Sequence, residues 1–173
     1  IFGKSIPIPQ IHADSETKEL ILVNATMLFA KKGYSTVSIR DIAESLGIRP
    51  ASLYNHYSSK EELWKAVVDH TRHLYLLYFE GLREAMDRVA TFEEVLETIF
   101  HEPKRLANVF TCHAFSLIQM EQFRDEYAGR VFTGTFLEYS IDVIRKRFDR
   151  CVAEGLAIPF DTAAVAAMIM QSV

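Results

Sequence analysis

Residues 38–57 read SIRDIAESLGIRPASLYNHY, in which two short segments of helical apolar periodicity are separated by Leu46-Gly47-Ile48. Ser38 and Asp41 have the Ser-x-x-Asp spacing that caps a helix, and Pro50 suits the first position of the next helix. A glycine in a short turn between two such helices is typical of a helix-turn-helix. We therefore predict that residues 38–57 form this motif and that its second helix enters the major groove of DNA.

Helical periodicity continues on both sides of this stretch. Residues 15–32 carry one apolar stripe and end before Gly33, and the pair Ser59-x-x-Glu62 caps a long helix that runs to about Arg88. Strand-like alternation and Asn-Gly or Asp-Gly hairpin signals are absent, so the sequence predicts an all-α protein. We expect further helices at 92–100, 104–118, 123–154 and 161–173, with breaks at Pro103, 119–122 and 155–159.

The composition is that of an ordinary globular protein, since 49% of the residues are hydrophobic and 24% are charged. The net charge of −4 by itself argues against nucleic acid as a partner. The acidity is concentrated late in the chain, because basic and acidic residues are balanced between His12 and His73 and acidic residues exceed basic ones from Leu74 onward. Cys112 and Cys151 are too few for a disulfide framework, and no apolar run is long enough to span a membrane. We therefore expect a reduced, cytoplasmic protein.

A longer ordered pattern extends around the turn, from Ile21 to Trp64. It consists of Ala25, Phe29, Gly33-Tyr34, the run from Ser38 to Ala43, Gly47-Ile48, the run from Leu53 to Tyr57 and the run from Ser59 to Leu63. In this pattern the chain resembles the DNA-binding domain of the TetR family of bacterial repressors. The resemblance implies an N-terminal three-helix helix-turn-helix domain followed by a C-terminal helical domain for ligand binding and dimerisation. The C-terminal domain varies within that family, so no ligand-binding residue is implied.

Three parts follow along the chain. Residues 1–14 are expected to be an arm or an expression remnant, residues 15–60 the helix-turn-helix DNA-binding domain, and residues 61–173 the helical sensing and dimerisation domain. The last periodic segment is still running at Val173, so we expect the natural protein to continue beyond it.

The resemblance also implies DNA contacts at the matched positions. Tyr54 corresponds to a recognition-helix tyrosine that contacts phosphate, Lys60 and His56 to residues that meet the backbone, and Arg40 to a base or phosphate contact. The candidate DNA-binding residues, including those at the exposed start and outer face of the recognition helix, are Arg40, Arg49, Pro50, Ala51, Ser52, Tyr54, Asn55, His56 and Lys60.

Two residues depart from the pattern of the family, and one contact has a simple alternative. Arg49 stands where a Ser or Thr cap is usual, so either the helix entry is looser or Arg49 itself reaches DNA. Val37 replaces a common threonine and removes a possible hydroxyl contact to phosphate. Arg40 could pair with Glu44 one helical turn later rather than bind DNA.

Tyr54 and Lys60 also have readings that do not involve DNA. Tyr54 could be a core aromatic residue, but helical spacing places Leu53 and Tyr57 on the buried face and leaves Tyr54 outward. Lys60 could be a solvated residue at a helix start.

Catalytic and metal-binding patterns are weak. His70 and His73 share a helical face, but no nearby ligand completes a metal site. Cys112 and His113 are adjacent and point about 100° apart on a helix, which argues against a thiol–imidazole pair. Phosphate loops, paired carboxylates and nucleophile elbows are absent, so we expect neither an enzyme nor a cofactor or metal site.

Aromatic side chains with interleaved polar groups are dense in the C-terminal part, which is typical of a cavity for a small organic ligand. The alternative is a filled core together with a dimer face. The predicted pocket residues are Phe100, His101, Phe110, His113, Phe115, Gln119, Met120, Phe123, Tyr127, Phe132 and Phe136.

The predicted function is that of a ligand-responsive repressor that binds a palindromic DNA operator as a homodimer and releases it for a small organic effector. Two alternatives remain open: a regulator of this kind with no small-molecule ligand, and a helical enzyme or carrier, against which the lack of a catalytic constellation weighs. The dimer face is predicted on 136–152 and 163–170, through Ile141, Ile144, Phe148, Ala166, Ala167, Ile169 and Met170, unless these residues pack only within the subunit.

Overall fold

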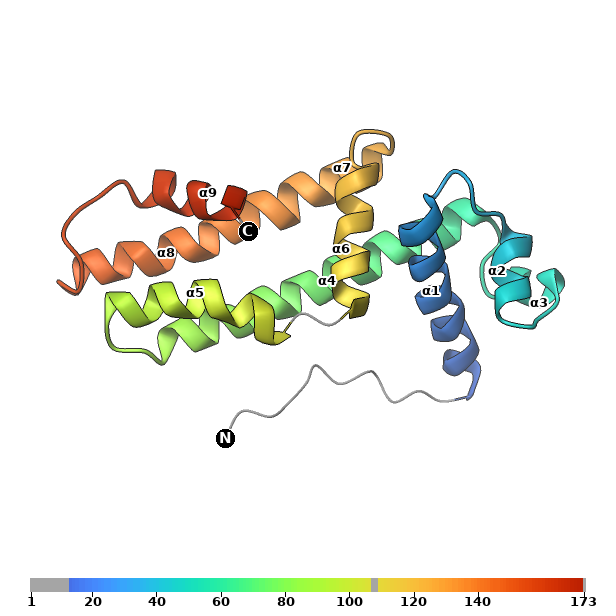
Figure 1. Ribbon diagram of the computed structural model, residues 1–173, viewed down its shortest axis with the longest axis horizontal. Coiled ribbons are helices and arrows are strands. Elements are labelled where there is room, and N and C mark those ends of the chain that lie inside the picture. The colour runs from blue at the N-terminus through green and yellow to red at the C-terminus, as the bar shows by residue number, and fades with distance from the viewer. Residues whose placement is uncertain (1–12, 107–108, 173) are drawn as a thin grey trace. The chain divides into compact units, whose positions relative to one another are not determined.

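The computed structural model describes residues 13–106 and 109–172, and in these residues the chain is helical and contains no strand, as predicted. The order of the helices can be followed in Figure 1. They are α1 (Ala13–Lys32), α2 (Ile39–Ser45), α3 (Pro50–Tyr54), α4 (Lys60–Asp87), α5 (Phe92–Leu106), α6 (Val109–Glu121), α7 (Glu126–Val131), the π-helical segment η1 (Phe132–Tyr139), α8 (Ser140–Ala153) and α9 (Thr162–Ser172). None of them is long and apolar enough to cross a membrane, within the part of the chain that the structure describes.

The chain folds into two compact units. The first, here called the head unit, contains the described residues 13–71 and 109–129, and the second, the C-terminal unit, contains 72–106 and 130–172. The head unit includes more than residues 15–60, which were predicted to form the DNA-binding domain, because the start of α4 and the helices α6 and α7 also belong to it.

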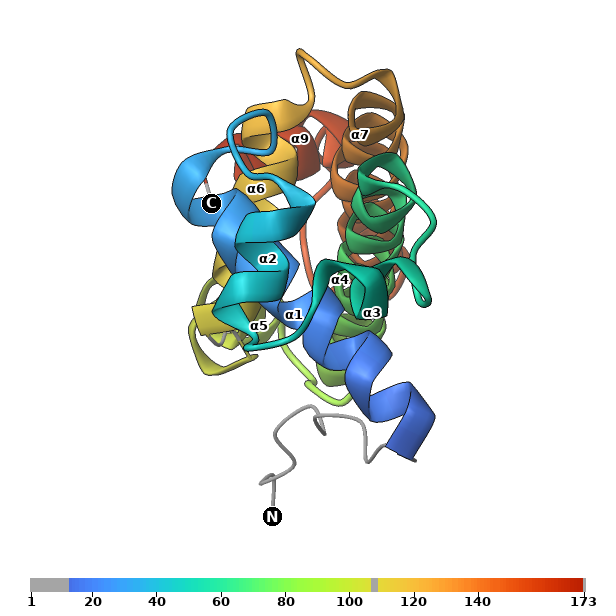
Figure 2. The ribbon, with the colours of Figure 1, turned by 90° about the vertical axis from the view of Figure 1, so that its right-hand side faces the viewer.

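Local hydrogen bonds form the predicted helix-turn-helix. The Oγ of Ser38 accepts the Asp41 N–H at 3.2 Å, and the Asp41 carboxylate accepts the Ser38 N–H at 2.7 Å, so both residues cap α2 as their spacing predicts. Gly47 has a φ of +66°, a conformation that favours glycine, and the next N–H, from Ile48, reaches the Ala43 carbonyl at 3.0 Å. This turn joins α2 and α3, which pack against each other (Figure 2).

The head unit has its own apolar core, to which every helix of the unit contributes. Helix α6 packs against α1, so this core contains residues distant in sequence from the helix-turn-helix. Its fully buried side chains include Ile21, Ala25, Phe29, Ile42, Ala43, Leu53, Leu63, Val67, Val68, Ala114, Leu117, Ile118 and Ala128.

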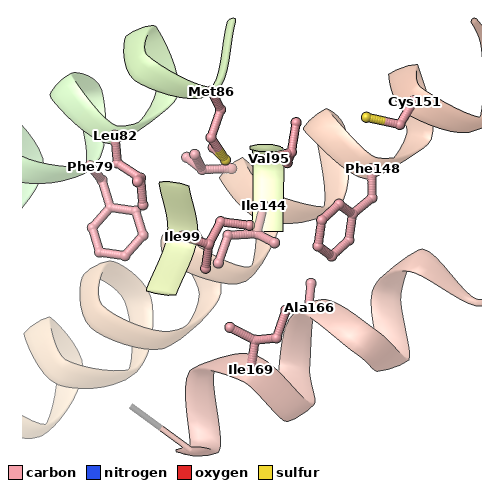
Figure 3. Packing of buried hydrophobic residues seen from close by; sticks show 11 residues of the cluster. Phe79, Leu82, Met86, Val95, Ile99, Ile144, Phe148, Cys151, Ala166 and Ile169 are labelled. Carbon is pink, nitrogen blue, oxygen red and sulfur yellow. The ribbon is translucent and has the colours of Figure 1, made fainter. Parts of the chain in front are cut away.

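The core of the C-terminal unit joins α4, α5, α8 and α9 (Figure 3). Ile144 and Phe148 of α8 point towards Ala166 and Ile169 of α9 in this core. All four residues are buried within their own unit, so the prediction that they form a dimer face is wrong. An apolar stripe must be buried somewhere, but its period does not reveal whether the covering surface belongs to the same subunit.

Arg147 is a charged residue in this core, only 5% exposed. Its Nε donates to the Met86 carbonyl at 3.0 Å and its Nη2 to the Val89 carbonyl at 3.4 Å. The Met86 carbonyl lies in the last turn of α4 and the Val89 carbonyl two residues beyond its end, where a cation meets the negative end of the helix dipole. Arg147 therefore fixes the end of α4 to α8.

Three of the predicted helices have wrong boundaries. Helix α5 continues through Pro103 and ends at Leu106, within about one turn of the proline, which removes a single backbone hydrogen bond. The helix predicted at 123–154 begins at Glu126 and is interrupted by η1. The helix predicted at 104–118 is α6, which spans Val109–Glu121, while residues 107–108 lie outside the described part.

The π-helical segment coincides with side-chain hydrogen bonds to its backbone. The Phe136 carbonyl accepts the Tyr75 hydroxyl at 3.1 Å and the Ser140 Oγ at 2.9 Å. Burial raises the pKa of Tyr75 to about 12, so its hydroxyl remains a protonated donor. These side chains satisfy a carbonyl in a stretch whose backbone pattern differs from that of an α-helix.

Gly129 and Gly81 provide a matched test of the packing. A Cβ at Gly129 would lie 2.7 Å from the Gln122 backbone oxygen, whereas a Cβ at Gly81 meets nothing within 4 Å. We expect Gly129→Ala to destabilise the protein by about 1–3 kcal/mol through overpacking. Gly81→Ala should stabilise the protein by about 0.5–1 kcal/mol by reducing backbone entropy in the unfolded chain. Urea unfolding of the three proteins measures both, and equal effects would contradict the described contact.

Candidate nucleic-acid interface

Helix α3 buries one face and exposes the other. Leu53 is fully buried and Tyr57 is 3% exposed, whereas Tyr54 between them is 51% exposed. The orientation predicted from helical spacing is thus confirmed, and Tyr54 is not a core residue. Of the other candidates on this segment, Arg49, Pro50, Ala51 and Asn55 are exposed and Ser52 and His56 are half-buried.

Tyr57 anchors the end of α3 to α1. Its hydroxyl donates to the Lys18 carbonyl at 3.4 Å, and the Lys18 Nζ lies 5.2 Å from the centre of the Tyr57 ring. Burial, followed by the charges of Glu62 and Glu19, raises the pKa of Tyr57 to about 12. The phenol is therefore neutral over the physiological range and remains a hydrogen-bond donor.

The two departures from the family pattern have visible consequences. Arg49 occupies the N-cap of α3 and forms no side-chain cap hydrogen bond, while its carbonyl accepts the Ser52 N–H at 2.9 Å. Its guanidinium is thus not used to start the helix. Val37 is 1% exposed, and a threonine there would have to bury its hydroxyl in the head-unit core.

Arg40 is exposed on the first turn of α2. The alternative ion pair between Arg40 and Glu44 does not form in the described structure. The guanidinium is therefore available to a partner outside the chain.

The start of α4 is capped as the sequence predicts. The Ser59 Oγ accepts the Glu62 N–H at 3.1 Å, and the Glu62 carboxylate accepts the N–H of Ser58 at 2.7 Å. The hydrogen bonds from Ser58 hold the pKa of Glu62 below its usual range. This cap places Lys60 at the first position of α4, half-buried, with its Nζ 4.3 Å from the centre of the Tyr34 ring.

Tyr34 is part of an aromatic group at the base of α4. Its ring centre lies 4.7 Å from that of Trp64 and 5.3 Å from that of Phe29. Its backbone N–H donates to the Glu121 carboxylate at 3.4 Å. Burial, followed by nearby carboxylates that include Glu61, raises the pKa of Tyr34. Sequence analysis matched Tyr34 to the motif but gave it no role, and no local signal links it to a residue 87 positions away.

Helix α7 contacts the N-terminal part of α4, through Tyr127. The Tyr127 hydroxyl forms a hydrogen bond with the Asp69 carboxylate, and the Lys65 Nζ lies 5.5 Å from the centre of the Tyr127 ring. Tyr127 was predicted to line a ligand pocket, and in this structure it packs on α4 within the head unit.

The predicted pocket residues are distributed over both units. Seven belong to the head unit, while Phe100, His101, Phe132 and Phe136 belong to the C-terminal unit. Only Phe132 and Phe136 are buried, and Phe123 is 88% exposed. Phe110, Phe115 and Tyr127 are half-buried, and Phe100, His101, His113, Gln119, Met120 and Phe123 are exposed. Whether any of these residues binds a ligand remains a prediction.

The weak metal and thiol candidates lie on α4, which carries His70 and His73, and on α6, which carries Cys112 and His113. His70 is half-buried with its ring centre 6.0 Å from that of Phe110, and Cys112 and His113 are both exposed. No group of three or more His, Cys, Asp or Glu side chains that could hold a metal ion occurs in residues 13–106 and 109–172.

Comparison with known sequences identifies a matching family and several relatives. The profile described as "Bacterial regulatory proteins, tetR family" matches residues 21–67. IcaR of Staphylococcus aureus, the negative transcriptional regulator of the biofilm operon icaADBC, is 27% identical over 119 residues, which make up 66% of this chain and 59% of IcaR. IcaR of Staphylococcus epidermidis is 44% identical over 52 residues, 30% of this chain and 28% of that protein. The alignments therefore cover less than two thirds of the length of these relatives.

Solved structures share the fold over most of the chain. A transcriptional regulator from Saccharomonospora viridis in complex with choline superposes with a TM-score of 0.71 at 20% identity, covering 91% of this chain and 83% of that one. GusR of Salmonella enterica superposes with a TM-score of 0.66 at 20% identity, and the match covers 95% of this chain and 83% of GusR. The ketosteroid transcriptional regulator KstR2 of Mycobacterium tuberculosis superposes with a TM-score of 0.64 at 22% identity. This match covers 94% of this chain and 81% of KstR2. Residues 21–67 of this chain therefore match the tetR family of bacterial regulatory proteins, and the chain shares its helical fold with these solved structures.

Proposed function

We propose that this protein is a transcriptional repressor that binds a palindromic DNA operator as a homodimer in the cytoplasm and responds to a small organic effector. The observation that carries the proposal is the outward face of α3, which exposes Tyr54 while Leu53 and Tyr57 anchor the helix in the head unit. This face lies within residues 21–67, which match the family. The repressing direction is supported by the relative IcaR, a negative regulator.

The polar and charged groups on this surface suit the two kinds of contact that DNA requires. Arg40, Arg49 and Lys60 supply cations for phosphates, and the Tyr54 hydroxyl supplies a neutral phosphate contact. The small Ala51 side chain, with Pro50, Ser52 and His56 beside it, permits close approach of the α3 backbone to the groove. Asn55, the C-cap residue of α3, is exposed, and its amide is of the kind that pairs with an adenine edge.

Lys60→Ala tests the phosphate contact. We expect the variant to bind all duplexes more weakly and to lower the slope of log K against log salt by about one, because one fewer counterion is released. Fluorescence anisotropy of a labelled mixed-sequence duplex at several salt concentrations measures both. Arg88→Ala removes the same charge just after the last turn of α4 and serves as the control. An unchanged slope for Lys60→Ala would exclude the contact.

Asn55→Ala separates base reading from phosphate binding. If Asn55 reads a base, the variant loses about 1–3 kcal/mol on a selected operator and nothing on mixed-sequence DNA. Selection of operators from random duplexes by the wild-type protein supplies the specific probe. Equal losses on both duplexes would assign Asn55 to the backbone instead.

The proposed dimer uses the outer face of α9 rather than the buried stripe. Met168 is 67% exposed there, and Ala164 one turn earlier is also exposed and small enough for close helix approach. Ala167 and Met170 are half-buried and flank this face. A two-fold axis across it would bring two copies of α9 together and leave the core of each C-terminal unit intact.

Met168→Glu should shift the protein to monomer at micromolar concentration in sedimentation experiments, because two carboxylates would be buried across the axis. Met120→Glu introduces the same charge at a methionine that is 51% exposed in the head unit and should leave the dimer intact. A Met168→Glu protein that remains dimeric would place the interface elsewhere.

The proposed effector acts through α4, which runs without interruption from Lys60 to Asp87 over 28 residues, about 42 Å. Binding in the C-terminal part would change the separation of the two recognition helices, which the duplex requires to be about 34–36 Å. The relative bound to choline supports a small-molecule effector. A second candidate function lacks the effector, and it is favoured by the exposure of six of the eleven predicted pocket residues.

Insertion of Gly-Pro after Leu74 distinguishes these possibilities. An effector, identified by the increase in melting temperature that it gives the wild-type protein, should lower wild-type DNA affinity. In the insertion variant weak DNA binding should remain and the response should disappear, because α4 is broken. Full release of DNA by the effector in that variant would exclude transmission through α4.

A further inference from the structure

We propose that Tyr34 is a positioning residue for DNA binding, which holds the Lys60 ammonium on the face of its ring in the free protein and presents it to a DNA phosphate. The inference rests on the proposed function, because it requires Lys60 to contact phosphate. It assigns a DNA-binding role to a residue outside the helix-turn-helix itself, in the loop between α1 and α2.

The contact between the two side chains has the geometry of a cation–π interaction. The Lys60 Nζ lies 4.3 Å from the centre of the Tyr34 ring, well within the distance at which a ring face attracts an ammonium group. Within the described residues Lys60 takes part in no ion pair, so the ring is what orients its charge.

Nearby carboxylates, which include Asp41 and Glu61, interact electrostatically with this ammonium, but none forms an ion pair with it in the described residues. The Asp41 carboxylate accepts the N–H and hydroxyl of Ser38, and the Glu62 carboxylate accepts those of Ser58. A carboxylate partner would neutralise the lysine and would have to be displaced by phosphate. A ring face leaves the formal charge and the N–H donors in place, so Lys60 is held and still able to bind an anion.

The Tyr34 ring is held in place by other contacts within the head unit. Phe29 is fully buried and Trp64 is 3% exposed, and both rings pack against Tyr34. Glu121, 4% exposed at the end of α6, accepts the Tyr34 backbone N–H. Tyr34 therefore presents a fixed surface to a lysine whose flexible four-carbon stem would otherwise sample many rotamers.

The experiment varies the electron density of the ring without changing its shape. Tyr34→Phe retains the ring face and is the reference, and phenylalanines with one, two or five ring fluorines at position 34 weaken the face step by step. Each protein is prepared with Lys60 and with Lys60→Ala. The probe is a labelled mixed-sequence duplex long enough for two half-sites, at low salt, and melting temperature confirms that each protein is folded.

We expect Tyr34→Phe to bind within about twofold of wild type, and the most fluorinated variant to bind about two- to fivefold more weakly than Tyr34→Phe, with intermediate values between. In the Lys60→Ala background the fluorine series should be flat. If Lys60→Ala weakens binding but the series is flat with Lys60 present, Tyr34 does not position Lys60, and the proposed phosphate contact stands.

The remaining outcomes also decide the question. Equal dependence on fluorination with and without Lys60 would mean that the ring acts through folding of the head unit, and would overturn the inference. Undiminished affinity of Lys60→Ala would overturn both the proposed phosphate contact and the inference built on it.

Discussion

One continuous helix has to satisfy two separate cores. Helix α4 buries Leu63, Val67 and Val68 in the head unit and Phe79, Leu82 and Met86 in the C-terminal unit. Successive residues of an α-helix advance by about 100° around its axis. If the apolar residues that α4 buries in one core were moved by one position, the helix would have to rotate by that angle, and its apolar side chains in the other core would turn towards solvent. The phase of the apolar pattern along α4 is therefore fixed by both units together. The Ser59 cap then sets where the helix begins, and so places Lys60 at its first position.

Polar contacts hold both ends of the same helix. Ser59 caps its start, and Arg147 donates to carbonyls at its C-terminal end from within the other core. Arg150 adds an ion pair with Asp87 in the last turn. Glu61 and Glu62 in the first turn and Arg147 near the end carry the charges that the helix dipole favours at those ends. A helix fixed at both ends transmits rotation better than one whose ends fray, which is the physical basis for assigning it the role of connecting effector and DNA.

Short-range features could be predicted from the sequence, and long-range ones could not. The Ser38–Asp41 cap, the Gly47 turn and the outward orientation of Tyr54 all depend on neighbours within one or two turns, and all three predictions are confirmed. The contact of Glu121 with Tyr34 joins residues far apart in the chain, and the sequence near either residue does not predict it. Aromatic density does not distinguish buried from exposed positions for a related reason: Phe123 and Phe136 are the same residue type, yet one is 88% and the other 1% exposed. Composition cannot say which face of a helix a neighbouring helix covers.

The net charge of −4 is compatible with DNA binding because phosphates respond to local charge. At physiological salt the Debye length is about 8 Å, so exposed charges further away are largely screened. The attraction for a phosphate therefore depends on which hydrogen bonds and ion pairs the charged groups in the first turns of α2, α3 and α4 already form. There the carboxylates of Asp41 and Glu62 accept backbone N–H groups, while the cations of Arg40 and Lys60 enter no ion pair within the described residues. A lysine held on an aromatic ring keeps its full charge, whereas one held by a carboxylate would present DNA with a neutral pair. The way each cation is held, more than the number of cations, therefore sets how strongly such a surface attracts a phosphate.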